Sequence, residues 1–358
     1  MIRDMKSRGT ARSSASRPPR RVESTARAYL SPLRGIPLVL ERLGVPSEPI
    51  LRSIGIHREE FDDPERSAPF TDLDRLLDLC VRKTKCEYFG LLLGQYVNLQ
   101  SYGVAGRLAR YAPSVGDALK DLASFFVLHD NGGSISLSIH EGSVTLSYGI
   151  HVSGLRRADQ VYDLSVASMI NIMRQLCGQD WRPDAALLPR KRPKEMRPYR
   201  ECLAAPLHFD SILAGIVFPE KCLSQPIADA DPLLHKLLAD NASAAVAHSD
   251  PILHAEVRRT IRGLLLTGKC SRSDVARRLG LHERKLGRQL QATGTTFQQL
   301  INETRSGIAR QLLHDSDLPV ARIAAALGYG HPNVFTRNFA RWTGRTPSEF
   351  RAELAERS

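Results

Sequence analysis

The chain of 358 residues has no apolar run that approaches the ~18 residues a membrane-spanning helix requires. No apolar segment of a secretory signal peptide follows the positive charges at the N-terminus. The six cysteines form no Cys-x-x-Cys pair, and no Cys/His run has zinc-finger spacing. We therefore expect reduced thiols, a cytoplasmic location, no contact with a membrane, and neither a metal nor another cofactor.

Common catalytic motifs are missing as well. The sequence contains no Gly-x-Ser-x-Gly, which excludes the usual hydrolase nucleophile turn. It also lacks the Gly-rich loop ending in Lys-Ser or Lys-Thr that binds nucleotide phosphates. We expect no catalytic residue and no enzymatic activity.

The net charge of +12 is distributed unevenly. Residues 250–358 carry eighteen Arg and Lys against ten acids, whereas residues 29–249 carry 24 against 26. Basic charge gathered in one folded segment is typical of a protein with a polyanionic partner. Charge alone is equally consistent with a merely soluble basic surface.

Three segments follow from composition. Residues 1–28 are rich in Arg, Ser and Pro and poor in apolar residues, so we expect a disordered basic tail. Such a tail adds non-specific attraction to DNA, or it is a solvated leader or a start codon placed too far upstream. Its Arg/Ser bias also resembles an organelle transit peptide, which the rest of the chain disfavours. Ser249-Asp250-Pro251 then predicts a boundary between a domain of residues 29–249 and one of residues 250–358.

The first domain is predicted to be α+β. Ser134–His140 and Ser143–Ile150 alternate apolar and polar residues around Glu141-Gly142, which predicts a hairpin pairing Ile139 with Val144, Leu137 with Leu146 and Ile135 with Tyr148. The other predicted elements are a helix from Thr71 through Cys80, one over Val115–His129 after Ser114, a long one over Asp159–Cys177, one over Leu233–Ala247, and strands at Ala185–Leu188 and Ile216–Phe218.

The second domain is predicted to be entirely helical and contains one local pattern twice. Ala276 precedes Gly280 by four residues, and Ala324 precedes Gly328 in the same way. Two helices that cross through a tight turn need a small residue at the crossing, and a residue that tolerates positive φ at the end of the first helix. The spacing therefore predicts two helix-turn-helix units.

Helix-start signals and a connecting helix support this prediction. Ser271-x-x-Asp274 is a capping box, and Pro332 suits the first position of a recognition helix. Thr346-Pro347-x-Glu349 predicts a closing helix. The apolar residues of Thr296–His314 recur at helical spacing, so this segment predicts a linker helix of ~27 Å that sets two recognition helices about one DNA turn apart.

The two helix-turn-helix units and their linker helix resemble the AraC/XylS family of transcription regulators. Ala324–Arg351 is similar to the family's signature region almost position by position, and the resemblance covers about residues 250–353. Residues 40–230 resemble, more weakly, an arabinose-binding-type effector domain through Phe89–Gly94, Tyr102–Gly106, Tyr199-Arg200, Ala205–Phe209 and Val217–Glu220. The resemblance implies a small-molecule sensor that also mediates self-association, hence a homodimer acting on promoter or operator DNA and RNA polymerase, with activation favoured.

The resemblance also implies which residues face the DNA groove. In the first unit these are Arg284, Lys285, Gly287 and Arg288, where Gly287 departs from the longer polar residue common in the family. In the second they are Asn333, Val334, Thr336 and Arg337, with Arg341 as a phosphate contact and Trp342 expected in the core. Arginine pairs with guanine, asparagine with adenine, and valine contacts a thymine methyl. A solvated helix face is the alternative interpretation.

An effector pocket is predicted less directly. Tyr102, Phe125, Phe126 and Tyr148 are candidates to line an apolar cavity, with ordinary core packing as the alternative. Arg107 or Arg110 would receive a ligand carboxylate, or lie on the surface. His129, His140 and His151 recur every eleven residues, which matches no metal-ligand spacing.

Two other functions are alternatives to this prediction. Some DNA-repair alkyl transferases carry AraC-type helices beside a reactive cysteine, but this chain lacks their Pro-Cys-His-Cys motif and a four-cysteine cluster. A nucleoid-like binder would ignore both sequence and metabolites, and a footprint shifted by a metabolite would exclude it.

Overall fold

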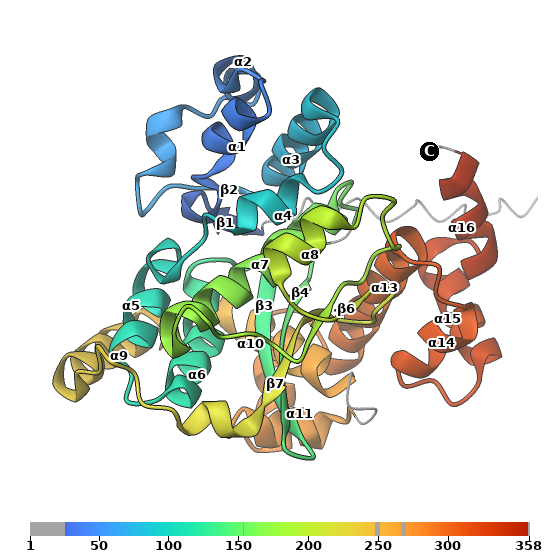
Figure 1. Cartoon of the computed structure of the whole chain (residues 1–358). Helices are drawn as coiled ribbons and strands as arrows, with labels where there is room; N and C mark the ends of the chain where they lie inside the picture. The colour runs from blue at the N-terminus through green and yellow to red at the C-terminus, as the bar shows by residue number, and fades with distance from the viewer. Residues whose placement is uncertain (1–25, 153, 248–250, 266–269, 357–358) are drawn as a thin grey trace, which may run out of the picture.

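The computed structural model describes residues 26–152, 154–247, 251–265 and 270–356 (Figure 1). Most of the expected tail lies outside these ranges. Its predicted end at residue 28 is wrong, because Arg27–Tyr29 (β1) already pairs antiparallel with Ser67–Pro69 (β2). The Arg27 side chain adds hydrogen bonds to Ser67, so the fold begins before residue 29.

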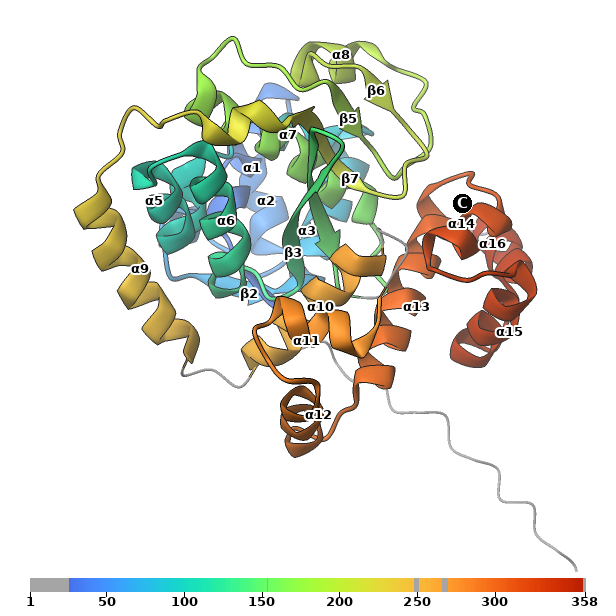
Figure 2. The same ribbon diagram turned by 90° about the horizontal axis from the view of Figure 1, so that it is seen from below.

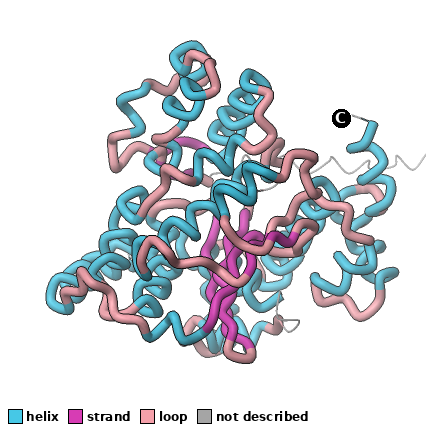
Figure 3. Tube along the Cα trace, in the orientation of Figure 1, coloured by secondary structure: helices cyan, strands magenta, loops and turns pink. Residues whose placement is uncertain are grey.

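The N-terminal domain is α+β, as predicted, with helices packed around a five-stranded sheet (Figure 3). The sheet order is β3-β4-β7-β5-β6, in which only β5 and β6 run parallel. The five strands are Gly133–His140 (β3), Ser143–Ile150 (β4), Ala185–Leu187 (β5), Leu207–His208 (β6) and Ala214–Pro219 (β7). The helices are Ile36–Arg42 (α1), Ser47–Arg52 (α2), Phe70–Thr84 (α3), Phe89–Gly94 (α4), Gly103–Tyr111 (α5), Val115–Phe125 (α6), Ala158–Cys177 (α7), Arg197–Leu203 (α8) and Pro232–Ala247 (α9). Short 3-10 helices occupy Ser31–Leu33, Arg58–Phe61, Leu99–Tyr102, Phe126–Leu128 and Glu220–Ser224.

The predicted hairpin register is confirmed. Ile139 pairs with Val144, Leu137 with Leu146, and Ile135 with Tyr148. Glu141 and Gly142 both have positive φ, 49° and 76°, as the two-residue turn requires. A shift by one residue would turn Val144 and Leu146, which are buried, towards the other face of the sheet.

Two expected helix boundaries are corrected. Helix α3 begins at Phe70, with Pro69 at its N-cap, so Thr71 lies inside the helix. Ser114 caps α6 as predicted, because its Oγ accepts the Asp117 N–H at 3.2 Å. That helix ends at Phe125 and tightens into a 3-10 turn, whereas the apolar periodicity predicted a helix through His129.

Helix α7 is the centre of the N-terminal domain, and most of its residues are buried. Helix α4 crosses it very closely at two glycines. A Cβ on Gly90 would lie 2.1 Å from the Gln160 carbonyl oxygen, and one on Gly94 would lie 2.6 Å from that of Leu164. The close helix crossing therefore explains the glycines of the Phe89–Gly94 motif.

In the described ranges the C-terminal domain consists of helices with a core of its own, as predicted. The helices are Pro251–Leu265 (α10), Arg272–Arg278 (α11), Glu283–Ala292 (α12), Phe297–Asp315 (α13), Val320–Ala326 (α14), Pro332–Thr343 (α15) and Pro347–Glu356 (α16). The expected break at Ser249-Asp250 lies outside the described residues, and α10 begins at Pro251. No helix in the described ranges is both long and apolar enough to cross a bilayer.

Candidate nucleic-acid interface and effector cavity

The first helix-turn-helix unit consists of α11 and α12. Ser271 and Asp274 form the predicted capping box at the start of α11. Gly280 has a φ of 64°, and the Leu281 N–H donates to the Ala276 carbonyl at 2.9 Å, which closes the turn. Ala276 is buried at the crossing, as a small residue should be.

The second unit, α14 and α15, repeats this geometry. Gly328 has a φ of 77°, and the Tyr329 N–H donates to the Ala324 carbonyl at 3.0 Å. Pro332 lies in the first turn of α15, as predicted. Arg305 of α13 fastens the turn, since its guanidinium donates to the Leu327 carbonyl at 3.1 Å and stacks on the Tyr329 ring at 4.8 Å.

The predicted groove-facing residues of α12 lie on its solvent side. Arg284, Lys285 and Arg288 are exposed, whereas Leu286 and Leu290 face the core. The His282 side chain accepts the Arg284 N–H at 3.2 Å and so caps the helix. Three cations therefore share the outward face of a helix whose opposite side is anchored.

Gly287 lies on the same face of α12 and contributes no side chain there. A Cβ there would meet no atom of the described residues within 4 Å, and its φ is not in the left-handed region. We expect Gly287→Ala to raise the free energy of unfolding of the C-terminal domain by about 0.5–1 kcal/mol, because glycine weakens a helix interior. Urea unfolding followed by circular dichroism measures this. A loss of stability would contradict the open environment.

Helix α15 presents Asn333, Val334, Arg337 and Arg341 to solvent, while Thr336 is half-buried. Val334 is an exposed apolar side chain, at 38%. Trp342 packs against the C-terminal core, as expected. Phe335 and Phe339 anchor the opposite side of the helix and are fully buried.

Helix α13 separates the two recognition helices. Its 19 residues span about 28 Å at 1.5 Å each. Helix α12 ends shortly before α13 begins, whereas α15 is held near its far half, where Arg310 donates to the Trp342 carbonyl at 3.2 Å (Figure 2). Two helix-turn-helix units at the two ends of one rod, with cations outward, define a DNA-binding transcription regulator.

Comparison with known families specifies the class further. Residues 44–227 match the model of the arabinose-binding domain of AraC transcription regulators, and residues 275–353 match a helix-turn-helix domain model. The chain belongs to the AraC family of transcription regulators. It is a DNA-binding regulator and not an enzyme.

Relatives share both domains with this chain. The regulator VirS of Mycobacterium tuberculosis is 26% identical over 88% of this chain and 93% of its own length. The ornithine utilization regulator of Pseudomonas aeruginosa is also 26% identical, over 86% and 91%. Among solved structures, the regulator CdpR of Pseudomonas aeruginosa matches over 88% of this chain and 98% of its own, with 23% identity and a TM-score of 0.42.

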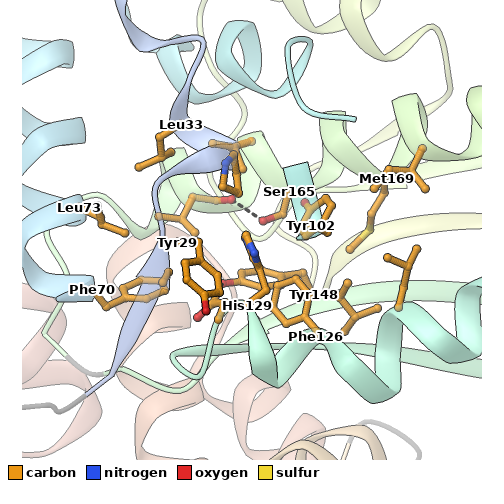
Figure 4. Close-up of a pocket in the computed structure, with 18 of the residues that line it drawn as sticks. Tyr29, Leu33, Phe70, Leu73, Tyr102, Phe126, His129, Tyr148, Ser165 and Met169 are labelled. Atoms are coloured by element: carbon orange, nitrogen blue, oxygen red, sulfur yellow. Dashed lines mark hydrogen bonds between the residues drawn. The ribbon is translucent and has the colours of Figure 1, made fainter. Parts of the chain in front are cut away.

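The N-terminal domain contains an apolar cavity of about 90 Å³ (Figure 4). Tyr102, Phe126 and Tyr148 line it, as the sequence predicted. Phe125 is half-buried and is not among the lining residues, so the prediction is wrong for its place in the wall, and Arg107 is exposed on α5, in line with the surface alternative. Arg110 is on the surface too, where it pairs with Asp229 at 2.9 Å.

Two buried residues at the polar end of the cavity were missed in the sequence. The Asp130 carboxylate accepts the N–H groups of Gly132 and Gly133 at 2.7 and 3.0 Å and the Tyr148 hydroxyl at 2.9 Å. Burial raises the pKa of Asp130 to about 6. Burial also lowers the pKa of His129 to about 3, so its imidazole is neutral. In the sequence, His129 stood out only through its spacing of eleven residues from His140, and nothing pointed to Asp130.

The raised pKa of Asp130 predicts how the free energy of unfolding changes with pH. The folded state binds the proton more tightly than the unfolded chain, whose pKa is near 3.8. The stability from this group is therefore complete below pH 3.8 and is lost as the pH rises towards 6. We expect the advantage of Asp130→Asn over the wild type to grow by about 1–3 kcal/mol across that window. Urea titrations at several pH values measure it, with exposed Asp229→Asn as the control. A constant difference would contradict the assignment.

The two domains meet along α10 and α13, which the sequence did not reveal. The Arg262 side chain is buried in this interface, and it donates to the Ile150 carbonyl at 2.7 Å. Arg259 donates to the Ala123 carbonyl, and the Tyr162 hydroxyl donates to Gln311 of α13 at 2.5 Å. Helix α10 accordingly lies against β3 (Figure 2). The DNA-binding domain is thus held by the N-terminal domain at both of its long helices.

Proposed function

We propose that this regulator binds specific operator sites as a homodimer and activates transcription by RNA polymerase in response to a small molecule held in the N-terminal cavity. The observation that carries the proposal is that one strand, β4, both lines the cavity and contacts the DNA-binding domain. Tyr148 lines the cavity, and the next residue, Gly149, lies directly under Arg262 of the DNA-binding domain. An occupant of the cavity therefore acts on the strand that holds the domain interface.

A second contact supports the same route. The Tyr148 ring lies 6.3 Å from the Tyr162 ring, edge to face, and Tyr162 is the residue that bonds to Gln311. A cavity of about 90 Å³ is smaller than the ~150 Å³ of an engineered cavity that binds benzene. A ligand of more than a few non-hydrogen atoms must therefore displace side chains that line the cavity. Differential affinity for the resting and displaced walls then shifts the equilibrium between domain arrangements.

For the DNA contacts we propose the roles that the exposed faces support. Arg284 and Arg288 read guanine in the first half of the site, and Lys285 binds phosphate. On α15, Asn333 and Val334 contact adenine and a thymine methyl. Arg337 binds guanine or phosphate, Arg341 binds phosphate, and Thr336 lies beside them.

The ligand itself differs, in our proposal, from those named for related proteins. The matching family description names arabinose, and one relative is named for ornithine utilization. A sugar would bury several hydroxyls against a lining that is mostly apolar, and each unpaired hydroxyl costs binding energy. A charged amino acid meets the same difficulty more severely.

The proposal is tested with an operator found by selecting genomic fragments on the purified full-length protein. Operator affinity is then measured with and without fractions of a metabolite extract. We expect one fraction to change it, and Leu73→Phe, which fills the cavity wall, to abolish the change while leaving ligand-free affinity intact. Leu38→Phe, at an exposed position outside the cavity, is the matched control. If no fraction changes affinity, effector control is wrong.

Activation is tested separately by in vitro transcription. With the selected operator upstream of a promoter and purified bacterial RNA polymerase, we expect transcript yield to rise when regulator and active fraction are both present. A fall in yield would identify a repressor.

A further inference from the structure

The polar end of the cavity contains one hydrogen-bonding atom that nothing satisfies. Nε2 of His129 is buried and has no hydrogen-bond partner in the described part of the chain. The ring lies among Tyr29, Tyr102 and Phe126, with centroid separations of 5.1, 5.2 and 6.1 Å (Figure 4). A buried polar atom without a partner is costly, and a partner supplied by a ligand would remove that cost.

The cavity's charged residues are already satisfied within the protein. Both carboxylates that line it, Asp74 and Asp130, accept hydrogen bonds from backbone N–H groups. Asp74 takes those of Arg156 and Arg157, while Asp130 takes two glycine N–H groups and the Tyr148 hydroxyl. These protein donors already stabilise both carboxylates, which reduces what either would gain from a ligand cation.

An anion is disfavoured still more. No Lys or Arg is among the described residues that line the cavity, and two carboxylates are. A ligand carboxylate buried there would have no counter-ion, and an unpaired buried charge is among the most costly groups in a protein.

We propose that the cavity binds an uncharged, mostly apolar molecule that carries one hydroxyl or carbonyl group, and that this group hydrogen-bonds to Nε2 of His129. The inference rests on the proposed effector function, which it makes specific. The neutral imidazole either donates from Nε2 to a carbonyl or accepts there from a hydroxyl, depending on its tautomer. Aromatic and aliphatic side chains from α3, α6, β4 and α7 bury the rest of the ligand.

The test uses four probes with the same four-carbon chain. These are 1-butanol, butyrate, butylammonium and 1-chlorobutane, titrated at pH 7.5 into the full-length protein. Binding is followed by the methyl NMR signal of Met169, which lines the cavity. We expect 1-butanol and 1-chlorobutane to shift this signal, and butyrate and butylammonium to bind at least about tenfold more weakly, because each would bury a charge.

His129→Leu distinguishes the contribution of the hydrogen bond to binding from that of the apolar cavity. In this variant we expect the affinity for 1-butanol to fall about two- to tenfold, with the affinity for 1-chlorobutane unchanged or higher. His129→Gln, which keeps a polar end group, should recover part of the 1-butanol affinity. Because His129 has an unsatisfied buried atom, we expect the leucine variant to fold at least as stably as the wild type.

Each other outcome overturns the inference. Equal binding of butyrate or butylammonium would show that the site accepts charge. If His129→Leu lowers the affinities for 1-butanol and 1-chlorobutane equally, the ligand does not hydrogen-bond to His129. If no probe binds, the cavity is not a binding site for this ligand class. If a metabolite fraction still changes operator affinity while all four probes fail, effector control stands and only this ligand class is wrong.

Discussion

Arg262→Ala is expected to weaken the docking of the DNA-binding domain on the N-terminal domain by about 1–3 kcal/mol, since it leaves the buried Ile150 carbonyl without its donor. Amide hydrogen exchange along α10 and β4 should then quicken by roughly five- to a hundredfold, while exchange in α7 stays unchanged. In the same variant, the proposed effect of ligand on operator affinity should shrink, because one buried contact between the domains is lost while those of Arg259 and Tyr162 remain.

Gly149→Ala is expected to weaken the docking of the two domains as well, through a change on the N-terminal side of the interface. The added Cβ would lie 2.0 Å from Nε of Arg262, and the three atoms nearest to it all belong to that side chain. The alanine should therefore undock the domains only when Arg262 is present. In the double variant the space is vacated, and we expect exchange no faster than in Arg262→Ala alone, a non-additive outcome.

The matched control for both variants is Arg258→Ala. Arg258 is also on α10, but it pairs with Glu303 of α13 at 2.6 Å, within the C-terminal domain, where Arg258 is half-buried and Glu303 is exposed. Solvent-accessible pairs of this kind contribute little, so docking should be preserved. Additive effects of Gly149→Ala and Arg262→Ala would contradict the proposed contact between them.

Arg288→Ala is expected to reduce operator affinity by about 1–3 kcal/mol, five- to 150-fold, and to relax sequence preference at one position of the site. Arg288 is exposed on α12, so its removal should leave the fold intact. Mobility-shift titrations on the selected operator and on single-base variants measure both effects. Lys285→Ala should instead weaken all DNA sequences alike and reduce the salt dependence of binding.

Loss of a positive charge alone must be separated from loss of a base contact. Arg197→Ala removes the same charge from α8 of the N-terminal domain, where Arg197 pairs with Glu201 at 2.7 Å. We expect almost no change in operator affinity for this control. If Arg288→Ala resembles Arg197→Ala, or weakens every sequence equally, Arg288 does not read a base.

The sequence predicted the elements whose determinants are local. The alternation of apolar and polar residues along the two strands predicted the hairpin register. The spacing of Ala276 from Gly280, and of Ala324 from Gly328, predicted both helix-turn-helix turns. These features depend on backbone conformation and burial within a few residues. The start of α3 was missed because Thr71 resembles a cap, whereas Pro69 precedes the first turn.

Features made by distant residues were not predicted. The cavity's polar end brings His129 against Tyr29 and Tyr102, from three separate segments. Arg107 was chosen because a cation suits a carboxylate ligand, but its position in α5 turns it towards solvent. The domain contact of Arg262 with Ile150 spans 112 residues, a separation at which no periodicity is informative.

The arginines that join the two domains bond mainly to main-chain carbonyls, Arg259 to that of Ala123 and Arg262 to that of Ile150 at 2.7 Å, and Arg262 adds a longer contact to the Tyr162 hydroxyl at 3.5 Å. No substitution of the carbonyl-bearing residues can remove those acceptors while the backbone keeps its course. We therefore expect that lining residues other than Tyr148 can change without loss of these arginine contacts. Under the proposed effector function, exchanging N-terminal domains between such regulators should preserve communication wherever the receiving backbone is superimposable.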